Sequence, residues 1–208
     1  MPDRLRPLWD FDDLDATAAR LHDQLEREES DSGRAEVLSQ LARVEGSMRD
    51  DFGHCAELLD KAELLAGDDP VANVRLELER GRMFRSSGDL EAAFPLFKSA
   101  FERASDAGEF WFAGDAAHMC AIAVTDRDLM EEWTQRGIEL GEREPDAAYW
   151  AGPLLNNLGW AYFDAGEHER ALELFEQALV VRERDPGNQA AIQFAKEAVE
   201  EARQALAR

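Results

Sequence analysis

A pattern of small and large residues in residues 155–178 constrains the fold of this chain more than any other feature. Residues of the pattern recur at intervals of three and four, which places them on one face of a helix. The first half carries Leu155, Leu158, Gly159 and Tyr162, and the second half carries Ala171, Phe175 and Ala178. Gly166 lies between the halves and predicts a break. The stretch therefore predicts two helices joined by a turn, a unit that buries little surface alone and must stack on neighbours.

The same pattern recurs along the chain. Residues 74–101 repeat it, with the matching positions Gly81, Phe84, Gly88, Ala93, Phe97 and Ala100, and Ala93 precedes Ala171 by 78 residues. Residues 111–138 match more loosely, because His118 and Met130 stand where small residues belong, and residues 35–66 form a first copy. The second-helix anchors are spaced by 38, 37 and 41 residues, at Cys55, Ala93, Met130 and Ala171.

Over residues 35–186 this pattern resembles the tetratricopeptide repeat (TPR) family. In that family each unit is a helix–turn–helix whose small residues let the two helices approach closely, and the usual period is about 34 residues. The spacing of about 37–41 residues here is similar to that of the long-period members. The resemblance implies an all-α fold: a right-handed superhelical stack of antiparallel helix pairs, or TPR-like α-solenoid, with N- and C-terminal capping helices.

We expect a single domain over residues 1–208. Its predicted parts are an N-terminal segment and capping helix (1–33), repeats at 34–70, 71–108, 109–145 and 146–187, and a C-terminal capping helix (188–208). The first repeat is predicted to contain helices over 34–49 and 53–66, and residues 29–33 are predicted to be a loop. Residues 1–12 are expected to be irregular, with Trp9 and Phe11 holding them against the first helices. Two prolines interrupt the predicted helices. For Pro95 we expect a late helix start near Phe94, and for Pro153 a kink near Trp150.

The chain is strongly acidic, with 45 acidic and 23 basic residues and a formal net charge of −22. Such a surface repels nucleic-acid phosphates and anionic membranes, so neither is an expected partner. The acidity is explained either by solubility, as in a high-salt or acid-rich proteome, or by attraction to a basic partner. The sequence begins without the apolar core of a signal peptide and has no membrane-spanning run, which favours the cytoplasm of a bacterium. Cys55 and Cys120 are expected in helix cores.

No constellation in the sequence carries recognisable catalytic chemistry. The histidines lack a second His or Cys at metal-ligand spacing on one helix face, and the stretch after His168 has Leu172 where a metalloprotease has its second His. Phosphate-binding glycine loops and the Gly-x-Ser-x-Gly motif are missing. The aspartates from Asp10 to Asp15 lack the glycine and glutamate of a calcium loop, so helix capping explains them better. We therefore expect no enzyme activity, cofactor or metal.

The resemblance implies that ligands contact one stripe of each unit's first helix, on the concave face. The predicted peptide-binding residues on this stripe are Arg43, Arg75, Arg82, Arg85, Phe112, Asp115, Met119, Asn156, Trp160 and Phe163. Arginine forks match the carboxylates of an extended peptide or its C-terminus. The aromatic rings would take an apolar side chain and Asn156 would bond peptide backbone. The alternative is that the arginines pair with acids on neighbouring helices, among them Glu36, Glu77 and Glu79, and that Trp160 packs in the core.

The sequence thus predicts a non-catalytic adaptor that binds a peptide segment of another protein in its concave groove. Two other hypotheses stay open. One is a regulatory or sensor module that receives a small peptide. The other is a self-associating structural protein, in which exposed apolar ends or aromatic residues form a homodimer.

Overall fold

Helices make up the regular structure of residues 3–207, the part of the chain that this computed structural model describes, and no strand occurs within it. The N-terminal half contains η1 (Arg6–Leu8), α1 (Leu14–Arg27), α2 (Asp31–Leu41), η2 (Ala42–Gly46), η3 (Ser47–Arg49), α3 (Phe52–Ala66), α4 (Pro70–Ser86) and α5 (Leu90–Asp106). The remainder contains α6 (Phe110–Ile122), α7 (Arg127–Arg143), η4 (Pro145–Trp150), α8 (Ala151–Asp164), α9 (His168–Arg182) and α10 (Gln189–Leu206). The prediction of an all-α chain is confirmed.

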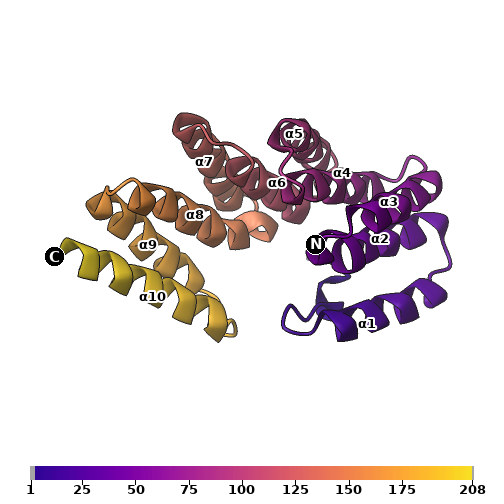
Figure 1. Cartoon of the computed structure of the whole chain (residues 1–208), viewed down its shortest axis with the longest axis horizontal. Helices are drawn as coiled ribbons and strands as arrows, with labels where there is room; N and C mark the ends of the chain where they lie inside the picture. The colour runs from indigo at the N-terminus through magenta and orange to yellow at the C-terminus, as the bar shows by residue number, and fades with distance from the viewer. Residues whose placement is uncertain (1–2, 208) are drawn as a thin grey trace. The chain divides into compact units, whose positions relative to one another are not determined.

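The chain divides into two compact units, Met1–Met119 and Cys120–Arg208. In the first unit α2 packs against α1, α3 and α4, and α4 packs against α5 (Figure 1). In the second unit α8 packs against α7 and α9, and α9 packs against α10. In each unit helices that follow one another in the chain therefore lie against one another, which is the packing of an α-solenoid. Among the described residues, no helix has the length and apolarity needed to cross a bilayer.

The two best-matching hairpins are closed by a glycine facing an aromatic ring. A Cβ atom added at Gly81 of α4 would come closer than 3.0 Å to the ring of Phe97 in α5. The same holds for Gly159 of α8 and the ring of Phe175 in α9. Both rings are fully buried. The predicted pairing of small and large positions is therefore confirmed in atomic contact, and it explains why these positions exclude larger residues.

Turns and caps separate the helices where the sequence predicts them. Gly88 and Gly166 adopt φ angles of 90° and 79° between the helices of their hairpins, a conformation that glycine adopts without steric cost. Aspartate carboxylates accept backbone N–H groups at helix starts, including Asp13 before α1, Asp69 before α4 and Asp89 before α5. These bonds satisfy amides that have no partner inside the helix.

Several predicted boundaries were wrong. The helix expected to start near Phe94 starts at Leu90 and continues through Pro95, which lies on its exposed side. Residues 145–150 form η4, and Pro153 lies in the first turn of α8, where a helix needs no N–H donor. Asp31–Gly33, predicted as loop, begins α2 because Ser30 caps it.

The first repeat's leading helix also differs from the prediction of one helix over 34–49. It ends at Leu41 and continues as the π-helical η2 and the 3-10 turn η3. Gly46 lies so close to Cys55 of α3 that an added Cβ would overlap its backbone. The π-helical turn η2 therefore occurs where its backbone approaches the backbone of α3 unusually closely.

Each unit contains buried apolar clusters. In the first unit Leu21, Leu41, Cys55 and Leu59 belong to one buried cluster that joins α1, α2 and α3. In the second unit Leu155, Leu158, Leu174 and Ala178 form a buried cluster between α8 and α9. Cys120 is also buried, so both cysteines lie in the interior as expected.

Candidate functional site

The structure brings together the predicted stripe residues of the first unit. Arg75 and Arg82 lie seven residues apart on α4, Arg43 lies on η2, and Phe112 and Asp115 lie on α6. Positions seven apart share a helix face, so Arg75 and Arg82 extend from the same side of α4. That side of α4 meets residues of α2 and of α6. The elements that carry these residues are therefore the first helices of successive predicted repeats.

Arg75 is bound by carboxylates of its own chain. Only 2% of the residue is exposed, and its Nε donates to Glu36 on α2 at 3.0 Å. Its Nη atoms donate to Asp3 in the N-terminal part of the chain. The guanidinium also lies over the ring of Phe112, 4.6 Å from the ring centre. Arg75 thus joins three separate parts of the first unit.

Arg82 forms a second buried ion cluster on the same helix face. It is 8% exposed and donates to Glu79 at 2.8 Å and to both oxygens of Asp115 at 2.6 Å. Burial acts against its charge, but the negative charges of Asp115 and Glu79 outweigh this and raise the pKa of Arg82. The guanidinium is therefore locked in its charged form.

Arg43 and Arg85 lie in the field of Arg82. Burial lowers the pKa of both guanidinium groups, and the positive charge of Arg82 lowers each further. Arg43 lies 3.9 Å from Glu79 and stacks over the ring of Trp9, 5.0 Å from its centre. The three arginines thus lie within range of one another's charge, and the carboxylates of Glu79 and Asp115 offset part of it.

The alternative of internal pairing describes Arg75 with Glu36 and Arg82 with Glu79. Glu77 instead accepts from Ser99 and Arg103 of α5. Nothing in the sequence pattern distinguishes these pairings. Binding of a foreign carboxylate by Arg75 or Arg82 stays a prediction, and it requires exchange of a carboxylate that each arginine already holds.

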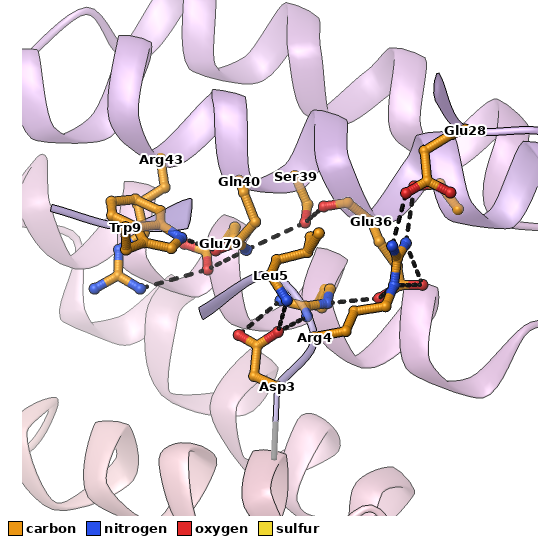
Figure 2. A network of polar contacts seen from close by, with 12 residues as sticks. Asp3, Arg4, Leu5, Trp9, Glu28, Glu36, Ser39, Gln40, Arg43 and Glu79 are labelled. Atoms are coloured by element: carbon orange, nitrogen blue, oxygen red, sulfur yellow. Dashed lines mark hydrogen bonds and ion pairs between the residues drawn. The ribbon is translucent and has the colours of Figure 1, made fainter. Parts of the chain in front are cut away.

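Residues Asp3–Phe11, called here the N-terminal segment, lie on this same face (Figure 2). Figure 2 shows Asp3, Leu5 and Trp9 facing Glu36, Ser39, Gln40 and Arg43. Arg4 donates to Glu28 at 2.6 Å and to Glu36 at 3.0 Å, and the indole N–H of Trp9 donates to Gln40 at 3.2 Å. The sequence predicted contacts of Trp9 and Phe11 with the first helices. It missed the roles of Asp3, Arg4 and Gln40, which have no periodic signal.

In the second unit the predicted residues lie on α8. Trp160 packs against Phe163 and Phe175, with ring centres 5.2 and 4.9 Å away. Trp160 and Phe163 are nevertheless only half-buried. Asn156 is 8% exposed, and its side-chain oxygen has no hydrogen-bond partner among the described residues. The same helix thus presents two partly open aromatic rings and an unused buried acceptor.

A hollow in the second unit lies apart from these residues. Its volume is about 540 Å³, and its lining includes Ile138, Leu155 and Val180 with the acids Glu142, Glu173 and Glu176. The sequence pattern gives no signal for this hollow, because its lining is shared among α7, η4, α8 and α9.

The fold and these faces define a helical-repeat protein. Residues 154–184 match the family model for the tetratricopeptide repeat, so the chain carries this repeat in α8 and α9. Among solved structures, 28 chains match. One is the crystal structure of BtubC (BKLC) from P. vanneervenii, with a TM-score of 0.61 and 19% identity over 93% of this chain and 91% of that chain. At this identity the likeness shows a shared fold alone. No curated protein matches.

Proposed function

We propose that this protein is a non-catalytic interaction scaffold that binds a peptide segment of another protein in the cytoplasm. The tetratricopeptide repeat and the stacked hairpins support interaction as the general role. One observation carries the proposed contact: the face of α8, where Asn156 holds an unpaired oxygen and Trp160 and Phe163 stay partly open.

A peptide backbone suits this face chemically. A buried acceptor without a partner costs about 1–3 kcal/mol, and rotation of the buried Asn156 side chain toward a peptide N–H would remove that cost. Trp160 and Phe163 provide large apolar area for a side chain of the same peptide.

The test begins with capture of a partner from native lysate on the immobilised chain, salt elution and identification by mass spectrometry. The binding peptide is then synthesised and its Kd is measured by fluorescence anisotropy. We expect Trp160→Ala and Asn156→Ala each to raise Kd at least tenfold. Leu64→Ala on α3 is the control, since this side chain is 86% exposed and belongs to another helix. An unchanged Kd in both α8 variants would reject the α8 contact.

A homodimer is the second candidate. Val180 on α9 and Phe194 on α10 are 56% and 55% exposed, and apolar residues exposed to this extent are typical of association surfaces when they form a patch. Light scattering of the purified chain measures its mass directly. A monomer mass at all concentrations would exclude this candidate, whereas a dimer that Phe194→Glu dissociates would support it.

A sensor module that receives a small free peptide would give a different result. The chain would then bind that peptide, and no partner protein would be captured from the lysate.

A further inference from the structure

The N-terminal segment contacts the arginine-bearing face in the way expected of a foreign peptide. Its carboxylate, Asp3, is held by the Arg75 guanidinium, and its cation, Arg4, is held by Glu36. Leu5 is 1% exposed and joins the buried cluster of the first unit. Trp9 lies against Gln40 and Arg43. Each of these partners lies on α2, η2 or α4, the elements that carry the predicted stripe (Figure 2).

The segment is attached by one buried ion pair, one buried leucine and several more exposed contacts, and the side chains of Arg75 and Asp3 in that pair are only 3% and 10% exposed. Leu5 is its one residue in the fully buried set. Leu8 and Trp9 are partly buried. Arg4 keeps 42% of its side chain exposed, and ion pairs of exposed groups stabilise a fold only weakly. The covalent link to α1 adds an effective concentration in the millimolar range. A free peptide of the same chemistry therefore competes only when its own concentration is comparable or when the internal ligand is weakened.

We propose that the face of α2, η2 and α4 is a peptide-binding site and that the N-terminal segment is its internal ligand. The partner that displaces it is a peptide with the same order of groups: a carboxylate, a cation and a leucine in succession, and an aromatic residue four positions after the leucine. Arg75 binds the carboxylate, Glu36 binds the cation, and Arg43 stacks on the aromatic ring. This site is separate from the proposed α8 contact, since the two lie in different units and each is tested without the other.

The test uses the full chain and a fluorescent peptide with the sequence of residues 3–12. The variant Leu5→Ala/Trp9→Ala weakens the internal ligand without altering the face. We expect it to bind the peptide at least tenfold more tightly than the natural chain does. Addition of Arg75→Gln should lower that affinity at least tenfold, and so should Asp3→Asn in the peptide. Arg136→Gln on α7 is the matched control and should leave Kd unchanged.

Circular dichroism and thermal unfolding establish whether the variant remains folded. A folded variant that binds the peptide no better than the natural chain does would overturn the proposal. If the variant unfolds, hydrogen exchange on the natural chain decides. We expect the amides of residues 3–9 to exchange faster than those of α2 and α4, and faster still with excess peptide. Protection equal to that of α2 and α4, with no response to peptide, would make the segment a fixed part of the core and overturn the proposal.

Discussion

At the scale of single residues, Arg82 shows how much depends on a buried charge. Its removal would leave Glu79 and Asp115 on neighbouring helices without their shared cation. We expect Arg82→Met to lower the free energy of unfolding by about 3–5 kcal/mol, measured by urea denaturation, because breaking a buried pair leaves uncompensated charge. Arg136→Met, which breaks an exposed pair with Glu132, should cost less than about 1 kcal/mol.

A double variant separates lost packing from stranded charge. Arg82→Met/Asp115→Leu removes one of the two stranded carboxylates, so it should be more stable than Arg82→Met alone. If the single variant is as stable as the natural chain, the ion cluster is not a stabilising feature.

Cys55 links burial to pH. Desolvation raises the pKa of its thiol from an ordinary value of 9.0 to about 11. As pH rises, the unfolded chain loses the Cys55 proton before the folded chain does. The stability that the protonated Cys55 thiol contributes is therefore complete below pH 9 and is lost as pH rises from 9 through 11. In a Cys120→Ala background, the native thiol should react with iodoacetamide at pH 8 roughly 100-fold more slowly than in urea, because the thiolate is the reactive form. Equal rates would show that Cys55 is accessible and ionisable in the native chain.

At the scale of elements, α5 forms although it contains Pro95, a residue that disfavours the interior of a helix. Proline cannot donate the bond to the carbonyl of Glu91, yet α5 runs from Leu90 to Asp106. The buried residues Ala93, Phe97 and Ala100 explain this, since they keep the helix on its partner α4. Since Pro95 itself is exposed, we expect Pro95→Ala to raise the free energy of unfolding by about 1–3 kcal/mol.

The matched control is Pro153→Ala in the first turn of α8, where no helical bond is missing. Its effect in the same denaturation experiment should stay within about 0.5 kcal/mol. Equal effects of the two substitutions would show that the missing bond in α5 is not the cause.

At the scale of the whole molecule, the net charge of −22 opposes folding through self-repulsion. Between 0.01 and 1 M salt the screening length falls from about 30 to 3 Å, which removes repulsion between distant surface charges, while buried pairs are screened much less. We expect Tm at neutral pH to rise with sodium chloride, measured by calorimetry. At pH 4.5, near the isoelectric point, the rise should vanish. A Tm that falls with salt at neutral pH would mean that surface ion pairs outweigh the repulsion.

Much of the fold was predictable because its determinants are local. Glycine positions predicted the turns at Gly88 and Gly166, and small and large residues at helical spacing predicted the contacts of Gly81 with Phe97 and Gly159 with Phe175. The face that gathers Arg43, Arg75 and Arg82 was predictable for the same reason, since its positions follow the helical period. The π-helical turn η2 and the 3-10 helix η4 were not predictable from the sequence, because such turns depend on what packs beside them.

The sequence by itself determined the hairpins and the positions of the arginines along each helix, because backbone preference and side-chain size act over a few residues. Only the tertiary structure decided what those arginines touch. Arg75 meets Asp3, 72 residues away, and Arg82 meets Asp115, 33 residues away. In a chain with 45 acidic residues, many carboxylates have the charge to pair with a given arginine. The partner is chosen by which helices and which segment pack together, and that choice is made by burial of apolar surface far from the charges themselves.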